Sequence, residues 1–272
     1  MARQWEHAAA ALVEAAIPAD PRLPAAWPVF AVLLPHARAV LALTDGGMSR
    51  IARYLGDSGS YLAARDLFQL IADAHMEDDA YRPEHPATLA ARHSLARWTG
   101  EAGDAAAARD QFAALLPIQE GVLGAEYLDT LNARRNLARW TGEAGDAAAA
   151  RDQLAALLPI QERVLGAEHP ETLAVRQNLA FWTGVAGDAA GARDQLAALL
   201  PVEERVLGPE HPATLMDRHG LAHWTGEAGD AAGARDQYAA LLPVFEQVLG
   251  PEHPETLEAR HNLAYWTEQA EN

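Results

Sequence analysis

Histidine is the residue type in this sequence whose recurrence first suggests chemistry. One histidine precedes a proline in most of the repeated segments, and these residues are His85, His169, His211 and His253. Imidazole is a common zinc ligand, but zinc requires its ligands at about 2 Å. Residues that occur once per segment should lie on the order of 10 Å apart, since packed helices are separated by about 8–10 Å. We therefore interpret these histidines as loop and helix-capping residues, and we predict neither a metal site nor a cofactor.

Catalysis is not indicated by any motif in the sequence. The chain has no Cys and no Lys, which removes thiolate chemistry, a phosphate-loop lysine and Schiff-base catalysis. It also has no nucleophile elbow, no zinc-protease motif and no glycine-rich phosphate loop. The His and Asp residues of interest all occupy repeated positions, so we find no non-repeated polar cluster. We predict that the protein is not an enzyme.

Repetition along the chain defines the elements that must position these side chains. Tryptophan recurs every 42 residues, at Trp98, Trp140, Trp182, Trp224 and Trp266. A fixed period of this length is typical of a solenoid, in which each unit buries its apolar face only against its neighbours. On a helical wheel each tryptophan falls on a packed stripe. We therefore predict a structural role for the tryptophans, in preference to stacking on a ligand.

Each repeated unit is predicted to contain two helices. The first helix begins near a proline, which suits a first helical position, at Pro86, Pro170, Pro212 or Pro254. It ends at a Gly-Asp pair such as Gly103-Asp104, where Gly stops one helix and Asp can cap the next. The second helix ends at Gly124, Gly166, Gly208 or Gly250. An internal proline predicts a kink in each second helix, at Pro117, Pro159, Pro201 and Pro243.

Four segments follow from this pattern. Residues 1–45 are predicted to form two helices, Arg3–Ala16 and Pro28–Leu43, that pack on the array. Residues 46–84 are a degenerate first repeat with helices near Gly47–Gly56 and Ser60–Glu77. Residues 85–253 are four full repeats. Residues 254–272 are a capping helix, in which Glu271-Asn272 replaces the Gly-Asp pair.

The first helix of each unit also has an open strip between its packed flanks. The packed leucine is unchanged in all copies, whereas two positions of the strip vary. One position reads His93, Arg135, Gln177, His219, His261, and the other reads Arg97, Arg139, Phe181, His223, Tyr265. Fixed positions serve the shared architecture and variable ones are available to a partner, so we predict a partner-binding groove here. The alternative is a solvent-facing strip that has drifted, as expected for a purely structural spacer.

These units resemble the tetratricopeptide repeat, in its 42-residue form found in kinesin light chains and many bacterial proteins. The matching text is G-x-E-H-P-x-T-L-x-x-R-x-N-L-A at Gly166–Ala180 and Gly250–Ala264, followed by Gly-Asp and a recurring alanine. The resemblance extends from about Gly47 to the end of the chain. It implies an all-α, right-handed superhelical solenoid of antiparallel helix pairs that holds a peptide or protein segment in its concave groove.

The resemblance also suggests specific groove residues. In the kinesin light-chain type, the Asn of N-L-A forms a ladder that can hold a peptide backbone, which carries over to Asn136, Asn178 and Asn262. Ser94 and Gly220 depart from this ladder. The predicted groove further includes Ser94 and Asn132.

The segment before the repeats carries a second resemblance. Residues Trp5 to Ala42, with Trp27-Pro28 and Leu33-Leu34-Pro35-His36, are similar to the segment that joins a nucleotide-switch module to its repeats in bacterial signalling ATPases of the NB-ARC kind. This resemblance implies a sensor or scaffold part of a signalling system.

Charge limits the classes of partner. The formal net charge of −17 opposes general nucleic-acid or anionic-membrane binding, because both surfaces would repel the chain. The first two copies of the strip carry Arg97, Arg134, Arg135 and Arg139, and the later copies are aromatic and neutral. This pattern predicts an acidic peptide partner, with nucleic-acid or nucleotide binding at the Arg-rich end as the alternative. We expect a cytoplasmic protein of a GC-rich bacterium, whose end helices could support self-association.

A second set of arginines recurs on the side opposite the strip. These are Arg92, Arg134, Arg176, Arg218 and Arg260. We predict that they form structural ion pairs with a recurring acid such as Glu120 or Asp110.

Charge reversal would test the basic part of the groove. Replacing Arg97, Arg135 and Arg139 together with glutamate should weaken binding of an acidic partner, because the attraction becomes a repulsion. Unchanged affinity in a titration of the partner would contradict the basic-groove hypothesis.

Overall fold

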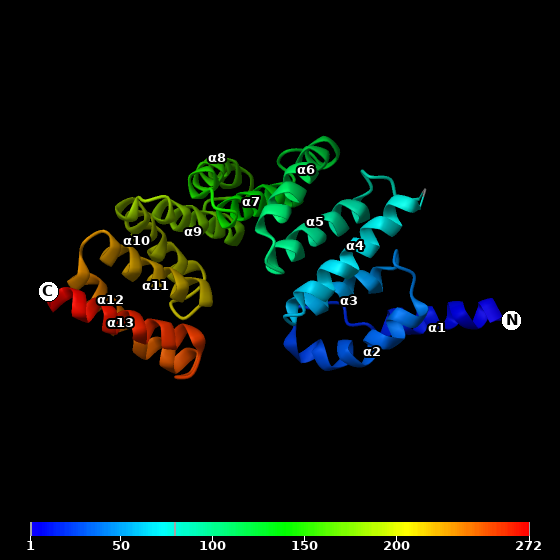
Figure 1. The fold of residues 1–272 in the computed structure, drawn as a ribbon, viewed down its shortest axis with the longest axis horizontal. Coiled ribbons are helices and arrows are strands. Elements are labelled where there is room, and N and C mark those ends of the chain that lie inside the picture. The colour runs from blue at the N-terminus through cyan, green and yellow to red at the C-terminus, as the bar shows by residue number, and fades with distance from the viewer. Residues whose placement is uncertain (1, 79, 272) are drawn as a thin grey trace. The chain divides into compact units, whose positions relative to one another are not determined.

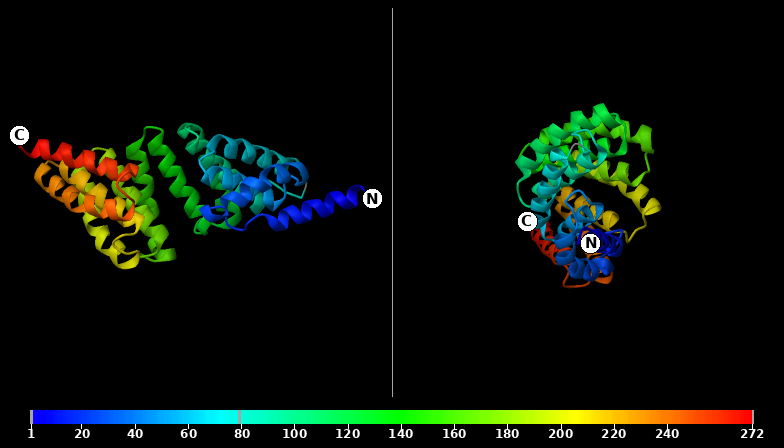
Figure 2. Two further views of the ribbon diagram at one scale, coloured as in Figure 1. Left: turned by 90° about the horizontal axis from the view of Figure 1, so that it is seen from below. Right: turned by 90° about the vertical axis from the view of Figure 1, so that its right-hand side faces the viewer.

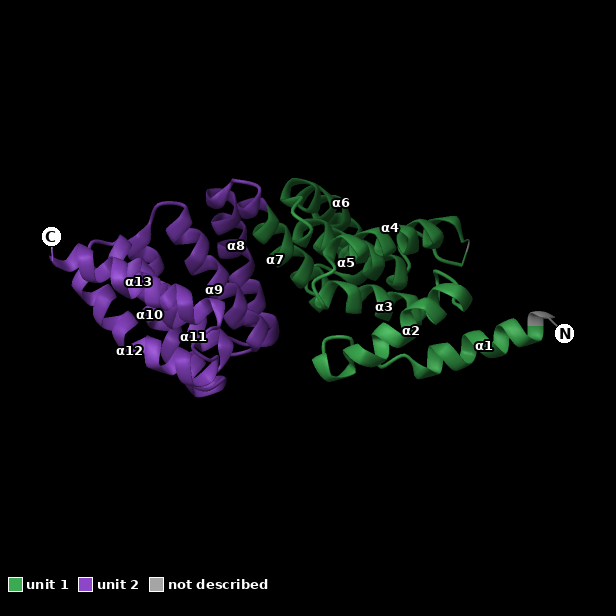
Figure 3. Cartoon of the chain, turned by 60° about the horizontal axis from the view of Figure 1, so that its bottom comes forward, with its two compact units in different colours: residues 1–140 green, residues 141–272 purple. Residues whose placement is uncertain are grey.

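The computed structural model describes residues 2–78 and 80–271, and all regular secondary structure within these ranges is helical. The described residues form thirteen α-helices, labelled in Figure 1, together with one short 3-10 helix, η1 (Pro24–Ala26). Two compact units, Met1–Trp140 and Thr141–Asn272, divide the chain and are coloured separately in Figure 3. Each unit is considered by itself. None of the described helices is both long and apolar enough to cross a bilayer.

The first unit contains the N-terminal helices and the first repeats. Its helices are α1 (Ala2–Ala16), α2 (Trp27–Val40), α3 (Gly46–Asp57), α4 (Tyr61–Glu77), α5 (Pro86–Glu101), α6 (Ala105–Leu123) and most of α7 (Leu128–Glu143). Helix α4 contacts both α3 and α5, and α3 also contacts α5. The ends of α3 and α4 differ by no more than one residue from those of the two helices predicted within residues 46–84.

The N-terminal helices pack on the degenerate repeat. The Phe30 ring of α2 stacks on Tyr54 of α3 with centroids 5.0 Å apart. The Glu14 carboxylate of α1 accepts hydrogen bonds from the Gly47 N–H at 3.0 Å and from Arg50 at 2.9 Å. Helix α2 ends at Val40, so its predicted extension to Leu43 is wrong. Helix α2 stops there because Leu41 adopts an extended backbone conformation. The backbone N–H of Ala42 then donates to the Asp45 side chain at 2.8 Å.

The second unit contains two complete helix pairs, with one further helix before them and one after them in the sequence. It consists of α8 (Ala147–Leu165), α9 (Pro170–Val185), α10 (Ala189–Val206), α11 (Pro212–Glu227), α12 (Ala231–Val248) and α13 (Pro254–Glu271). Each helix contacts the next along the chain, and α11 also contacts α9 and α13. The views of Figures 1 and 2 agree on these neighbours. Asn272, part of the predicted C-terminal cap, lies outside the described residues.

Local capping sets the helix ends as predicted. The imidazole Nδ1 of His169 accepts the backbone N–H of Glu171 at 3.2 Å, and His85, His211 and His253 cap their helices in the same way. Asp104 accepts the N–H of Ala107 at 3.0 Å. Gly103 has φ +100°, a backbone conformation that favours glycine. The interpretation of these histidines as caps is confirmed.

The second helices continue through their internal prolines. Pro117, Pro159, Pro201 and Pro243 all lie inside α-helices. Each proline is exposed, so water can bond the carbonyl that has lost its helical donor. The kink at these positions stays a prediction.

Four of the five arginines in the second set form ion pairs that repeat along the chain, and the pairing of Arg92 stays a prediction. Arg134 bonds Glu120 at 2.7 Å, and the same pair, fourteen positions apart, recurs as Arg176–Glu162, Arg218–Glu204 and Arg260–Glu246. The predicted role is therefore confirmed for Glu120. The alternative acid, Asp110, instead pairs with its neighbour Arg109 at 2.7 Å.

Each repeated tryptophan ring packs closely against a glycine of the preceding unit. A Cβ added to Gly100 would lie 2.4 Å from the Trp140 ring. The same contact joins Gly56 to Trp98, Gly142 to Trp182, Gly184 to Trp224 and Gly226 to Trp266. Four of these tryptophans are buried, and Trp224 is half-buried. Their predicted structural role is confirmed, and the glycine of W-T-G is its counterpart.

This contact predicts opposite effects for two helical Gly-to-Ala substitutions in the first unit. Gly100→Ala should lower the free energy of unfolding by about 1–3 kcal/mol or more, because the methyl group overlaps the Trp140 ring. Gly121→Ala should raise it by about 0.5–1 kcal/mol, because nothing lies within 4 Å of the new methyl group and alanine favours the helix. Urea denaturation of both variants measures the difference. Equal effects would contradict the close tryptophan–glycine contact.

Candidate functional site

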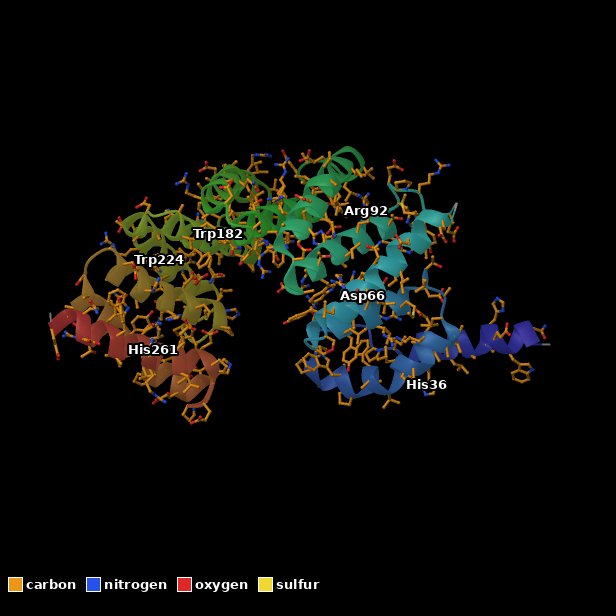
Figure 4. All side chains as sticks on the ribbon, in the orientation of Figure 1. His36, Asp66, Arg92, Trp182, Trp224 and His261 are labelled. Carbon is orange, nitrogen blue, oxygen red and sulfur yellow. The ribbon has the colours of Figure 1, made fainter. Side chains whose placement is uncertain are left out.

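The open strip of the second unit forms a cavity of about 540 Å³ between α9, α11 and α13, with one residue from α10. Five predicted groove residues line it: Gln177, Phe181, His219, His223 and Asn262. The other lining residues are Val185, Leu196, Met216, Asp217, Gly220, Trp224, Glu255 and Glu258. Figure 4 labels Trp182 and Trp224 on the neighbouring helices α9 and α11.

One wall of the cavity is apolar and open to solvent. Phe181, Val185 and Met216 remain 47%, 46% and 40% exposed, respectively. Single exposed apolar residues are common, but three that share one cavity are typical of a binding surface.

Gly220 creates part of the space. A Cβ added there would lie 3.1 Å from Leu196 Cδ1, whereas other copies carry Asn or Ser at this position. The departure of Gly220 from the asparagine ladder therefore leaves room for the cavity.

Asp217, one of the lining residues, forms a buried carboxyl pair with Glu203, which does not itself line the cavity. Asp217 is 2% exposed, and Glu203 of α10 is 1% exposed. The Gln177 amide donates to Asp217 Oδ1 at 2.5 Å. The positions equivalent to Asp217 are Ala91, Ala133, Val175 and Ala259, and those equivalent to Glu203 are Gln119, Gln161 and Phe245. The absence of a non-repeated polar cluster, inferred from the sequence, is therefore wrong.

Burial determines the protonation of this pair. Loss of water raises the pKa of the Asp217 carboxyl above its ordinary range. Burial first, and then the neighbouring Asp217, raise the pKa of Glu203 even more strongly. Two carboxyls in one dry site cannot both ionise readily, so they share a proton near neutral pH.

His219 and Asn262, which also line the cavity, belong to a second polar group. The Asn262 amide donates to Tyr238 Oη at 3.3 Å and lies 3.0 Å from His219 Nε2. Burial lowers the pKa of His219, so this imidazole is neutral and can accept the amide proton. In the first unit, Asn136 similarly donates to the Asn132 carbonyl at 2.9 Å. These amides bond within the chain, and their predicted hold on a peptide backbone stays a prediction.

In the first unit, the predicted strip lines two separate hollows. His93 and Ser94 line both, Asn132 lines one of about 310 Å³, and Arg97 lines the other, of about 600 Å³. Burial first, and then Arg97 and Arg135, lower the pKa of His93 to about 4. His93 is therefore uncharged at neutral pH.

The basic character predicted for this strip is largely offset by acids. Arg97 lies 3.7 Å from the Asp57 carboxylate and 4.2 Å from the Trp98 ring centroid. Arg139 bonds Glu101 at 2.8 Å and lies over the Trp140 ring at 4.4 Å. Arg134 belongs to the repeated pairs with Glu120. The expectation that the later copies are neutral is also wrong, because Asp217, Glu255 and Glu258 line their cavity.

The remaining predicted residues lie outside these hollows. His261, labelled in Figure 4, and Tyr265 are exposed on α13. Arg135, Asn178 and Arg139 are half-buried on their helices. Asp217 and Glu203 were not predicted from the sequence, although the acid at position 217, where other copies carry Ala or Val, was a visible signal. Among the described residues, no group of three or more His, Asp or Glu is arranged to hold a metal ion.

Comparison with known proteins identifies the repeat. Residues 130–171, 172–213 and 215–255 match the sequence profile of the family described as Tetratricopeptide repeat. No curated protein sequence matches the chain.

Solved structures support the same fold. Nearly identical TPR-like repeats from Podosopora anserina, described as those of a kinesin light chain, are 26% identical with a TM-score of 0.64, covering 74% of this chain and 93% of theirs. A signal-transduction ATPase with numerous domains and a tetratricopeptide repeat sensor, from Pyrococcus horikoshii, is 13% identical with a TM-score of 0.68, covering 96% of this chain and 38% of its own. Bacillus thuringiensis PlcR, solved with the peptide PapR7 and DNA, is 15% identical with a TM-score of 0.58, covering 86% and 81% of the two chains.

The carboxyl pair predicts a specific dependence of stability on pH. Both folded-state pKa values are raised, so the pair's contribution is complete below the unfolded carboxyl pKa of about 4 and is lost as pH rises through the folded values. The Glu203→Gln variant carries the residue type found at the equivalent Gln161. It should remove most of this pH-dependent loss of stability and raise the free energy of unfolding above neutral pH by about 1–3 kcal/mol. Urea unfolding at pH 5, 7 and 9 measures both effects.

The control for this experiment is Glu210→Gln, which removes an exposed carboxyl in the same unit. It should leave the slope of stability against pH unchanged. Parallel slopes for the wild type and Glu203→Gln would show that the pair does not hold a shared proton.

Proposed function

Because the chain carries tetratricopeptide repeats, we propose that it is a protein–protein interaction module that holds a peptide or an extended protein segment in the cavity between α9, α11 and α13. The observation that carries the proposal is the cavity of about 540 Å³ lined by five residues of the variable strip. An extended segment can place its side chains into such a cavity while the helices stay fixed. The fold is a scaffold type, and a non-catalytic role follows from the same proposal.

A sensor or scaffold role in a signalling system extends this proposal. The Pyrococcus protein is described as having a tetratricopeptide repeat sensor, and the Bacillus protein is described in complex with a peptide. We transfer to this chain the coarse idea of a repeat array that responds to a bound partner. Self-association through the end helices and a cytoplasmic location stay predictions.

Nucleic-acid or nucleotide binding at the Arg-rich end gains no support from the geometry. Arg97 and Arg139 already pair with Asp57 and Glu101, and phosphate binding would have to compete with these carboxylates. Such binding would be recognised by a steep loss of affinity with added salt.

Selection from a displayed library of short random peptides tests the proposed function. Enriched peptides should bind the wild type and lose about tenfold or more in affinity to Gly220→Leu, whose side chain occupies the cavity; a tenfold loss corresponds to about 1.4 kcal/mol. Phe181→Ser, which removes an exposed ring from the wall, should weaken the same peptides. Fluorescence polarisation with labelled peptides gives the affinities.

A matched surface change controls for non-specific effects. Leu70→Ser alters an exposed leucine of α4, which is 53% exposed and belongs to the other unit. It should leave peptide affinity unchanged, and circular dichroism should show all three variants to be folded. Failure to enrich any peptide, or equal affinity for Gly220→Leu and the wild type, would overturn the proposal.

A further inference from the structure

We propose that the cavity of the second unit selects a partner segment carrying an arginine next to apolar side chains, so that the guest has the opposite charge to the acidic partner expected from the sequence. The proposal rests on the proposed function and specifies the chemistry of the partner. It follows from three observations, which concern the floor, the rim and the wall of the cavity.

The floor holds a buried anion that the repeat architecture does not require. Asp217 lines the cavity and is 2% exposed. Together with Glu203 it keeps one negative charge near neutral pH, and no arginine lines the cavity to balance that charge. Another copy of the repeat has Val175 at the position of Asp217 and Gln161 at the position of Glu203, so the helix packing does not need acids there. Because a buried charge without a cation is destabilising, the pair is best explained by a cation that binds from outside the chain.

The rim adds charge of the same sign. Glu255 and Glu258 of α13 line the cavity, and the lining residues include no arginine. His219 also lines it, but burial lowers the pKa of this imidazole, so it adds no positive charge at neutral pH. Acids that converge on a partly dry hollow attract a cation more strongly than they would in water. A partner segment with acidic side chains would be repelled by Asp217, Glu255 and Glu258.

The first unit shows how this chain itself accommodates a guanidinium. Arg97 lies over the Trp98 ring and near the Asp57 carboxylate, with distances of 4.2 and 3.7 Å. Arg139 does the same with Trp140 and Glu101. Each arginine therefore combines an aromatic face with a carboxylate, an arrangement that stabilises a planar cation.

The second unit keeps the aromatic part of this arrangement without its own arginine, and the carboxylates that line its cavity stand at other repeat positions. The positions equivalent to Arg97 and Arg139 are Phe181 and His223, both of which line the cavity together with Trp224. Trp224 is half-buried, whereas the other four repeated tryptophans are buried. An aromatic surface and carboxylates thus surround an open space. Phe181, Val185 and Met216 are placed to contact the apolar stem of the arginine and its apolar neighbours.

Matched peptides test the charge of the guest. The probes are four capped, fluorescein-labelled pentapeptides with leucines flanking a central arginine, lysine, glutamate or citrulline, the last being a neutral isostere of arginine. The arginine peptide should bind the full-length chain about tenfold or more tighter than the citrulline peptide, a difference of about 1.4 kcal/mol. The glutamate peptide should bind most weakly. Added salt should reduce the preference for arginine.

Two variants place the preference in the cavity. Asp217→Val, which reproduces Val175, and Glu258→Gln should each lower affinity for the arginine peptide toward that of the citrulline peptide. Affinity for the citrulline peptide should change little. Glu210→Gln removes one exposed carboxyl of the same unit without touching the cavity, and should leave all affinities unchanged.

The outcomes separate this inference from the proposed function. Equal binding of the arginine and citrulline peptides, with both weakened by Gly220→Leu, would overturn the arginine preference and leave the peptide-binding function standing. Tighter binding of the glutamate peptide would also overturn it. If no pentapeptide binds while library peptides sensitive to Gly220→Leu do, the arginine preference is wrong. If the library yields nothing either, both proposals fail.

Discussion

The contact between each tryptophan ring and a glycine of the preceding unit constrains how closely the first helices can approach one another. At Gly142 the backbone comes so near the Trp182 ring that even a methyl group would overlap it. A large flat side chain therefore packs against bare backbone, which removes apolar surface from water and leaves no void. Because the ring and the glycine belong to consecutive units, both must recur with the period of the repeat. This pairing explains why W-T-G hardly varies along the chain.

Once this flank is fixed, the strip beside it can vary without disturbing the stack. In the first unit the chain uses that freedom for Arg97 and Arg139, which pair with acids of neighbouring helices. In the second unit it places Phe181 and His223 at the same positions, and the missing side chain of Gly220 opens space beside them. The same architecture thus places arginine–acid pairs along the strip of one unit and an acid-lined cavity without an arginine in the other.

The buried carboxyl pair shows how a site is introduced into a repetitive core. Asp217 replaces an alanine or valine of the other copies, and Glu203 replaces a glutamine or phenylalanine. Burial raises the pKa of both carboxyls, so the pair holds a shared proton in place of a salt bridge. Such a pair destabilises the fold as pH rises, because the folded state must then give up a proton held in a dry site. Repeats elsewhere in the chain avoid this loss. A stability defect confined to the cavity floor is the pattern expected of a residue kept for binding.

The amino-acid sequence by itself determined the period, the helix pairs, their caps and the structural tryptophans, because these depend on neighbours within a few residues or on exact repetition. It also revealed which positions of the strip vary. The tertiary structure alone decided that Arg97 and Arg139 pair with Asp57 and Glu101, and that Glu203 lies beside Asp217. These pairs join side chains on different helices, so their approach depends on the stacking distance and rotation of the helices. A pattern of residue types along one helix does not contain those two quantities.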